Sequence, residues 1–241
     1  MSGRYCVVIP AFQAGDTIGD LVRRIKLLQL AVVVVDDGSR DQTASLAAQH
    51  GALVISHLQN QGKGRALRTG FDYALRSQYD GVITMDSDGQ HDPEEIPHLI
   101  RAGEVQHAGI VVGDRMADGG AMPPLRRGTN AFMSAVVSAL IRQRIPDSQC
   151  GSRFIRKEVL SSVPLRTAHF ESETELLLSA SLRRWKIISV RVRSIYQGHQ
   201  SHIRPVRDAM RFLHLVVRHI VSRWVGSLTV RAQRNRAAGN L

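Results

Sequence analysis

The 241-residue sequence has few of the residues that mark several classes of protein. Its two cysteines, Cys6 and Cys150, are too few for a disulfide framework or a four-thiolate zinc site. Aromatic residues make up only 5% of the chain, so the interleaved aromatic and basic residues of many nucleic-acid-binding surfaces are missing. No run reaches the roughly 18 apolar residues of a spanning helix, and the first apolar run is too short for a signal peptide. We therefore expect a reducing, cytoplasmic setting.

Acidic residues are nearly absent from the last quarter of the chain. Residues 183–241 hold thirteen Lys and Arg against the single acid Asp208, whereas residues 1–182 hold 19 basic and 20 acidic side chains. This asymmetry favours an anionic partner for the tail, namely a membrane surface, a lipid phosphate or nucleic acid. A solvated arginine-rich tail is the alternative.

The first half of the chain alternates between strand-like and helix-like segments. Short apolar runs predict strands at 4–9, 31–35, 53–56, 81–85 and 110–113. Periodic segments between them predict helices at 16–28, 41–49, 63–77 and 93–105, with Asp41 and Asp92 as N-caps. Strands separated by helices indicate βαβ units, so we predict an α/β fold with a mainly parallel, Rossmann-like sheet and flanking helices.

The second half is less regular, with predicted helices at 126–141 and 173–183 and predicted strands at 151–155 and 186–192. A long amphipathic helix is predicted at 208–228, with an apolar stripe of Phe212, Val216, Ile220, Trp224 and Leu228. Such a helix fits an anionic membrane surface, or it packs on the rest of the protein or on a second subunit. Because composition changes near residue 200, we expect one domain at 1–200 and a basic amphipathic C-terminal element at 201–241.

Acidic residues follow three of the predicted strands. Asp36 and Asp37 follow the second, Asp86 and Asp88 the fourth, and Asp114 the fifth. Ligands of parallel α/β sheets bind outside the carboxyl ends of the strands, and acids spaced i, i+2 in an extended chain point the same way. Oxygen ligands suit Mg²⁺ or Mn²⁺, and such an ion would neutralise charge on a leaving nucleotide.

A glycine-containing segment, Asn60-Gln-Gly-Lys-Gly-Arg, leads into the predicted helix at 63–77. It is not a Walker A sequence, because no Ser or Thr follows Lys63. It does place Lys63 and Arg65 near a helix N-terminus, which suits an anion.

Five motifs, taken together, resemble family 2 glycosyltransferases. They run in order within residues 5–193: Val8-Ile-Pro-Ala-Phe, Val35-Asp-Asp-Gly-Ser, Asn60-Gln-Gly-Lys-Gly, Asp86-Ser-Asp-Gly-Gln-His-Asp-Pro and Asp147-Ser-Gln-Cys-Gly-Ser-Arg-Phe. The similarity is closest to the dolichol- or polyprenyl-phosphate mannose synthase branch. The resemblance implies a GT-A fold and a metal-dependent, inverting transfer of a sugar from a UDP- or GDP-sugar to a lipid-linked acceptor such as polyprenyl phosphate.

The resemblance also implies a donor site at the carboxyl ends of the first, second and fourth predicted strands. The residues assigned to the nucleotide are Pro10, Asp36, Asp37, Lys63 and Asp86. The residues assigned to Mg²⁺ or Mn²⁺ are Asp86, Asp88 and Gln90. Asp88 is assigned a catalytic part as well.

On the acceptor side, the resemblance implies phosphate binding by Arg115 and Arg126. Asn130 and Ser201 complete the assigned acceptor residues, although the branch usually has a serine near Asn130 and a Gly-Ser-Arg in place of Gly113-Asp-Arg. Arg115 and Glu175 are also assigned catalytic parts.

A lipid phosphate needs no catalytic base, whereas a hydroxyl acceptor of a lipid or other glycoconjugate needs one. Glu173 or Glu175 is the candidate base, and a solvated helix face is the alternative explanation for both. Of the other titratable groups, His91, His98 and His199 are left unassigned, and His202 is a candidate phosphate or sugar contact.

Two other classes of protein compete with this assignment. A sugar-nucleotide pyrophosphorylase opens with a glycine-rich loop and an arginine after the first strand, where this chain has Pro10-Ala-Phe-Gln-Ala-Gly. A non-catalytic protein that binds an anionic surface or nucleic acid accounts for the tail but leaves the ordered acids unexplained. We therefore expect no nucleic-acid partner, and an enzyme peripheral at the inner face of the membrane.

Overall fold

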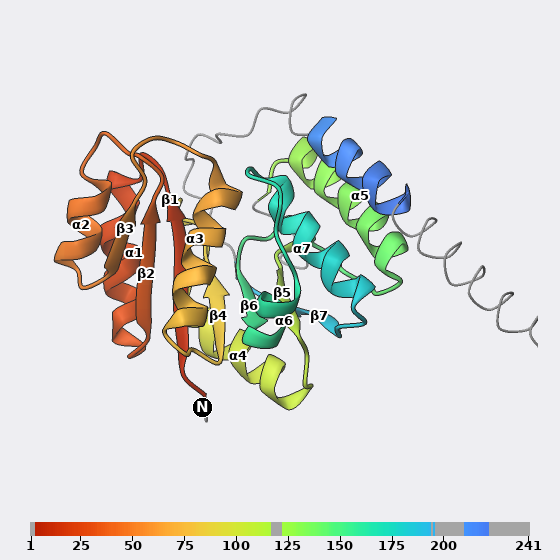
Figure 1. Ribbon diagram of the computed structural model, residues 1–241, viewed down its shortest axis with the longest axis horizontal. Helices are drawn as coiled ribbons and strands as arrows, with labels where there is room; N and C mark the ends of the chain where they lie inside the picture. Colours follow the sequence, from red (N-terminus) through yellow and green to blue (C-terminus); the bar gives the residue numbers. More distant parts are fainter. Residues whose placement is uncertain (1–2, 117–121, 194, 196–209, 222–241) are drawn as a thin grey trace, which may run out of the picture. The chain divides into compact units, whose positions relative to one another are not determined.

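A computed structural model describes residues 3–116, 122–193, 195 and 210–221 of the chain. It contains a sheet of seven strands in the order β3-β2-β1-β4-β6-β5-β7 (Figure 1). The strands are β1 Tyr5–Ala11, β2 Ala31–Asp36, β3 Leu53–Ser56, β4 Gly81–Thr84, β5 Ile110–Asp114, β6 Arg153–Arg156 and β7 Ile187–Arg191. Neighbouring strands are parallel except where β6 pairs with β4 and β5. The predicted α/β fold with a mainly parallel sheet is confirmed.

Helices cover both faces of this sheet. They are α1 Gly15–Leu27, α2 Thr43–Gln49, α3 Lys63–Arg76, the 3₁₀ helix η1 Pro93–Glu95, α4 Ile96–Val105, α5 Pro124–Ile141, α6 Lys157–Ser162 and α7 Glu171–Leu182. The connections through α1 and α2 advance one way along the sheet, whereas α3 leads back past β1 to β4. Right-handed crossovers therefore put α3 on the opposite face. Accordingly α1 packs on α2, while α3 packs on β1 and also meets α6 and α7 (Figure 1).

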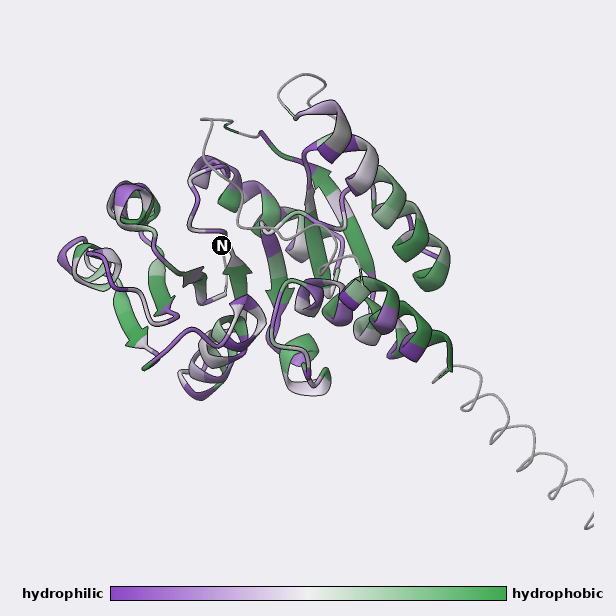
Figure 2. Cartoon of the chain, turned by 90° about the horizontal axis from the view of Figure 1, so that it is seen from above, coloured by the Kyte–Doolittle hydropathy of each residue, from purple (hydrophilic) through white to green (hydrophobic). Residues whose placement is uncertain are grey.

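The core lies on the central strands, which carry almost no polar side chains. Every residue of β1 is buried, as are Val32–Val35 in β2, because helices cover a parallel sheet on both faces. Figure 2 shows these strands as hydrophobic and the flanking helices as mixed. Cys6 and Cys150 are both free and buried, and burial raises the pKa of each thiol to about 12.

The sheet opens at its carboxyl edge between β1 and β4, where the order of strands reverses. Pairing of these strands ends at Val8 with Thr84, and the Val8 carbonyl accepts a final hydrogen bond from the Met85 N–H. Pro10 lies two residues further along β1, so its backbone nitrogen points to the same side as that of Val8, at a level beyond the end of β4. Its missing N–H therefore costs no ladder hydrogen bond. Such a reversal point is where open α/β sheets bind ligands.

The strand predicted at 151–155 is present as β6, but its reversed direction was not predicted, and that direction decides which loop reaches this edge. Arg153, its first residue, pairs with Thr84, the last residue of β4. The loop before β6 is therefore delivered to the same edge as the segment after β4. The short helix α6, directly after β6, was also not predicted.

The two predicted helix caps have different outcomes. Asp92 accepts a hydrogen bond from the Glu94 N–H at 3.2 Å, with Pro93 at the first helical position, so this cap is confirmed. The Asp41 cap is wrong, since α2 begins at Thr43 with Gln42 as N-cap. Asp41 instead accepts hydrogen bonds from the N–H groups of Thr43 and Gly15. Its carboxylate therefore ties the start of α2 to the start of α1.

The chain divides into two compact units, Met1–Gln200 and Ser201–Leu241. In the second unit, residues 210–221 form a helix, inside the segment predicted at 208–228. Trp224 and Leu228 of the predicted apolar stripe lie outside the described residues. None of the helices that the structure describes is long and apolar enough to cross a membrane. A membrane role for the C-terminal element remains a prediction.

Candidate active site

A cluster of three charged side chains lies at the carboxyl edge where the sheet opens. The Lys63 Nζ is 2.7 Å from Asp86 Oδ1 and 2.8 Å from Glu173 Oε2. The three residues come from the start of α3, the segment after β4 and the first turn of α7. Their side chains are 15%, 23% and 11% exposed respectively, so the cluster is largely but not fully shielded from water. We refer to these three residues as the Lys63 cluster.

The charges of the Lys63 cluster stabilise one another. Burial acts to raise the pKa of Asp86, but the Lys63 charge and a hydrogen bond from His91 outweigh it, and the pKa lies well below its ordinary value. For Lys63 burial acts to lower the pKa, and the charges of Asp86 and Glu173 reverse that effect and raise it. Both groups are therefore charged at neutral pH. The His91 Nε2 adds a contact at 3.5 Å to Asp86 Oδ2.

Close backbone packing holds the start of α3 in this place. Gly62 has a φ of +96°, which favours glycine. A side chain on Gly62 would run into His169, and one on Gly64 would run into Ser172. The Arg65 N–H also donates to the Ala168 carbonyl at 3.2 Å. The loop before α7 and the glycine segment therefore pack directly on each other, which explains the two glycines.

The segment after β4 is a turn rather than an extension of the strand. β4 ends at Thr84, and Ser87 and Asp88 are in a turn, so the extended geometry expected for the two acids is wrong. Asp88 Oδ1 accepts a hydrogen bond from the Gln90 N–H at 3.0 Å. The Gln90 Oε1 is buried and has no hydrogen-bond partner in the described part of the chain. An orphaned buried oxygen of this kind is costly unless a ligand satisfies it.

The predicted metal ligands do not form a ready-made cluster. Within the residues that the structure describes, no three His, Cys, Asp or Glu side chains are grouped so as to hold a metal ion. Asp86 is instead paired with Lys63. A side chain on Gly151, in the loop before β6, would run into both carboxylate oxygens of Asp86. The reversed strand thus places bare backbone against this carboxylate.

The residues assigned to the nucleoside lie at the same edge, and Asp37 has internal partners. Asp37 Oδ1 lies 2.7 Å from His57 Nδ1 and accepts from the Gln61 N–H, while Oδ2 accepts from the Gly62 N–H at 2.7 Å. Asp37 therefore organises the segment that leads to Lys63. Asp36 accepts from the Ser39 N–H at 3.1 Å. Both aspartates and Pro10 are buried.

On the acceptor side, Arg115 is locked in a bidentate ion pair. Its Nε and Nη2 donate to the two oxygens of Asp147 at 2.7 and 3.2 Å, and both side chains are almost fully buried. Asp147 belongs to a motif used for the family resemblance, but no role was predicted for it. Nearby, the buried Arg153 donates to the carbonyls of Cys150, Ser148 and Glu173. This arginine joins the loop before β6 to α7.

The two candidate glutamates of α7 differ in their surroundings. Glu173 belongs to the Lys63 cluster. Glu175 Oε2 accepts from the N–H groups of Arg166 and Thr167 and from the Thr167 hydroxyl, each at 2.8 Å. Both glutamates are buried, so the solvated helix face is wrong. Glu175 anchors the loop before α7, and Glu173 reaches the carboxyl edge.

The remaining assigned residues lie in α5 or outside the described residues. Arg126 is half-buried in the first turn of α5, and Asn130 is buried one turn further along. The Asn130 Nδ2 donates to Met122 Sδ at 3.7 Å. Ser201, like His199 and His202, lies outside the described residues. His98 is exposed on α4.

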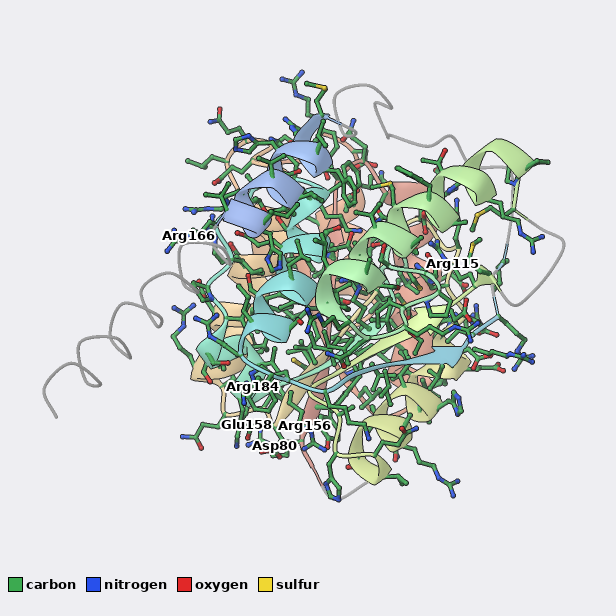
Figure 3. All side chains as sticks on the ribbon, turned by 90° about the vertical axis from the view of Figure 1, so that its right-hand side faces the viewer. Asp80, Arg115, Arg156, Glu158, Arg166 and Arg184 are labelled. Carbon is green, nitrogen blue, oxygen red and sulfur yellow. The ribbon has the colours of Figure 1, made fainter. Side chains whose placement is uncertain are left out.

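A second charged group lies at the opposite edge of the sheet. Asp80 precedes β4, and it accepts from the Arg4 N–H and pairs with Lys157 at 3.0 Å. Figure 3 shows Asp80 beside Arg156 and Glu158, well away from Arg115. This exposed ion pair provides a comparison for the buried charges of the carboxyl edge.

The mostly parallel sheet with charged residues at its reversal point is of the GT-A type. Residues 6–163 match the family model described as glycosyl transferase family 2, and the chain belongs to this family. It is therefore a glycosyltransferase, as the five motifs predicted. The pyrophosphorylase and the non-catalytic protein are set aside.

Relatives and solved structures agree with this assignment. The chain is 32% identical to polyprenol monophosphomannose synthase of Mycolicibacterium smegmatis, over 67% of this chain and 65% of that protein. It is 28% identical to UDP-N-acetylglucosamine–dolichyl-phosphate N-acetylglucosaminyltransferase of Methanococcus voltae, over 79% and 85% respectively. Its fold resembles glucosyl-3-phosphoglycerate synthase of Mycobacterium tuberculosis in complex with Mn²⁺, UDP and phosphoglyceric acid. That similarity has a TM-score of 0.71 and 24% identity, and covers 92% of this chain and 78% of that chain.

Proposed function

We propose that this protein is an inverting, metal-dependent glycosyltransferase that moves a sugar from a UDP- or GDP-sugar to a polyprenyl phosphate. The observation that carries the donor half is the Lys63 cluster, which lies at the reversal point of the sheet beside the orphaned Gln90 Oε1. The acceptor half rests on the relatives from M. smegmatis and M. voltae, whose names specify a polyprenol or dolichyl phosphate product or acceptor.

The residues at this edge fit a hard divalent cation. Asp86 and Asp88 offer carboxylate oxygens, and Gln90 offers an amide oxygen that is buried without a hydrogen-bond partner in the described part of the chain. Mg²⁺ and Mn²⁺ prefer such oxygen ligands. When bound, the ion would supply positive charge for the leaving diphosphate. The M. tuberculosis structure, which contains Mn²⁺ and UDP, has the same fold.

The chain's own residues would then bind the donor and fix its orientation. Lys63 brings a charged ammonium to the first turn of α3, where helix N–H groups also favour an anion. Asp37 holds the Gln61 and Gly62 peptides in place through their N–H groups. The diphosphate would therefore meet a preorganised backbone, which lowers the cost of binding it.

The state of the two glutamates favours an acceptor that is already anionic. Glu175 is hydrogen-bonded to the loop before α7 and Glu173 is paired with Lys63. A phosphate oxygen is itself a nucleophile and needs no base, whereas a hydroxyl acceptor would need one. Arg115 and Arg126 remain the proposed acceptor-binding residues, together with Asn130 and Ser201.

We extend the proposal to the C-terminal element, 201–241, as a membrane contact appended to a catalytic domain at 1–200. Each basic residue near an anionic surface contributes roughly 1 kcal/mol of attraction. Deleting residues 205–241 should therefore release the protein from vesicles with anionic lipid. Equal vesicle binding by the truncated protein would contradict this part.

Two measurements test the proposal. Titration calorimetry with UDP and GDP, with and without Mn²⁺, should show metal-dependent binding of one of them and so identify the base. A transfer assay should then give a labelled, solvent-extractable glycolipid from polyprenyl phosphate but none from the dephosphorylated polyprenol. Transfer only to a hydroxyl acceptor such as phosphoglyceric acid would overturn the acceptor assignment.

A further inference from the structure

Lys63 lies where its charge conflicts with a metal ion. The ammonium contacts Asp86 Oδ1 at 2.7 Å, and Asp86 is one of the proposed metal ligands. A divalent ion on this carboxylate would bind an oxygen directly, at about 2.0–2.1 Å for Mg²⁺. Two cations so close to one carboxylate repel each other strongly in a partly buried site. Lys63 and the metal ion therefore compete for Asp86.

The backbone around Lys63 is tightly packed, so any movement of the ammonium must come from the side chain. Gly62 and Gly64 pack against His169 and Ser172, and Asp37 holds the Gly62 N–H. The Lys63 side chain is long and flexible by comparison, and besides the two carboxylates its ammonium lies 5.6 Å from the centre of the Phe170 ring. Glu173, at 2.8 Å on the other side of Nζ, gives the ammonium a second carboxylate that does not depend on Asp86.

A diphosphate at the start of α3 would offer the same ammonium a stronger partner. Lys63 is the first residue of α3, where a bound anion gains from the helix N–H groups. Negative charge arriving there would draw Nζ away from Asp86 and leave that carboxylate open to a metal ion. Without the diphosphate, Nζ returns to Asp86.

We propose that Lys63 is a counter-ion latch that makes binding of the divalent metal depend on binding of the nucleoside diphosphate. The latch rests on the proposed function, because it assumes that Asp86 binds the metal. It predicts that the protein binds Mn²⁺ weakly by itself and much more tightly once UDP or GDP is present. By thermodynamic reciprocity, the metal strengthens nucleotide binding by the same factor.

Mn²⁺ binding to the nucleotide-free protein tests the latch directly. The electron paramagnetic resonance signal of free Mn²⁺ reports binding without any need for activity. Lys63→Met should bind Mn²⁺ at least about tenfold more tightly than the wild type, because the competing charge is gone. Lys63→Arg keeps the charge and should stay weak. Lys157→Met, which removes the ion pair to Asp80 at the opposite edge, should not differ from the wild type.

A double variant separates the latch from a simple change of net charge. Lys63→Met combined with Glu173→Gln removes one positive and one negative charge, so the cluster keeps its wild-type net charge. The latch predicts that this variant still binds Mn²⁺ more tightly than the wild type, because Asp86 has lost its occupant. Affinity at the wild-type level in the double variant would overturn the latch.

The nucleotide-containing arm tests the coupling. UDP or GDP should raise the Mn²⁺ affinity of the wild type by a larger factor than that of Lys63→Met. An equal factor in both proteins, or an equal nucleotide-free affinity in both, would overturn the latch. If Lys63→Met does not fold by thermal melting, Lys63→Gln supplies the neutral side chain. Failure of the wild type to bind either nucleotide would overturn the proposed function instead, and the nucleotide-free comparison would still decide whether Lys63 competes with Mn²⁺.

Discussion

Asp86 and Asp147 are both acids paired with a cation at the carboxyl end of the sheet, but the two pairs differ in form. Asp147 receives both arms of Arg115, and neither side chain is more than 3% exposed. Asp86 receives one contact from a lysine, and the two side chains are 15% and 23% exposed. A buried bidentate pair is costly to open, whereas a single lysine contact near water exchanges readily. The first pair holds the structure together and the second is available for ligand exchange.

The largest expected effect is on the transfer rate, and it comes from replacing the acids of the exchangeable Lys63–Asp86 region. Asp86→Asn and Asp88→Ala should each lower the transfer rate by about 10²-fold to 10³-fold, because charge stabilisation of the leaving group is lost. The melting temperature should fall less than in a variant of the buried Arg115–Asp147 pair, because Lys63 keeps Glu173 as a partner when Asp86 is neutral. Turnover assays on both variants provide the check, with Asp80→Asn as the control. Unchanged turnover would remove the metal assignment.

Breaking the locked pair should act on stability instead. Asp147→Asn removes the carboxylate charge that pairs with the buried Arg115 guanidinium. We therefore expect a loss of about 3–5 kcal/mol in the free energy of unfolding. Urea unfolding followed by circular dichroism measures it. A loss well below 1 kcal/mol would mean that the Arg115 pair is as exchangeable as the Lys63 pair, and the contrast would fail.

The two glutamates of α7 should show the same contrast between a structural and an exchangeable acid, with smaller changes in the free energy of unfolding. Glu175→Ala leaves the N–H groups of Arg166 and Thr167 without their acceptor and should cost about 1–3 kcal/mol of unfolding free energy. Glu173→Ala removes the contact to Lys63 and a longer one of 3.9 Å to Arg153, and it should cost less because Lys63 keeps Asp86 as a partner. The reverse order in urea unfolding would show that the Lys63 cluster, rather than Glu175, anchors α7.

The smallest effect is expected at the exposed pair of the opposite edge. The Arg4 N–H, and then Lys157, lower the pKa of Asp80 below its ordinary value. A lowered pKa stabilises the fold above the unfolded-state pKa of about 3.9 and loses that contribution as the pH falls through the folded-state value. Asp80→Asn should therefore melt slightly below the wild type at pH 7, and the difference should vanish in strong acid. A constant difference across pH would exclude this ion pair as its source.

The first half of the fold was predictable because each of its strands is an apolar run between turn residues. The strands at 53–56 and 110–114 and the helix at 63–76 lie within a residue of their predicted ends. The direction of β6 was not predictable, since a four-residue strand carries no information about its neighbours. Helix α6, of six residues, is too short for a helical period to be read.

The sequence predicted which residues belong to the candidate site, but not which of their side chains contact one another. The motifs identified Lys63 and Asp86, yet only the fold shows that they touch. Glu173 and Glu175 stand two apart on α7, about 200° around the helix, so one faces the cluster and the other a loop. Sequence alone does not fix which is which. The roles of Asp147 and Arg153 arise from burial, which no motif reports.

The reversed strand also has a consequence for protein engineering. β5 ends and β6 begins at the same edge of the sheet, so the chain between them, 115–152, leaves and returns at one place. Such a segment forms a cassette whose two splice points are adjacent. Exchanging it between relatives would replace Arg115, Arg126 and Asn130 together and leave the Lys63 cluster native. Chimeras cut at these points would therefore test whether the proposed acceptor residues set the acceptor preference independently of the Lys63 cluster.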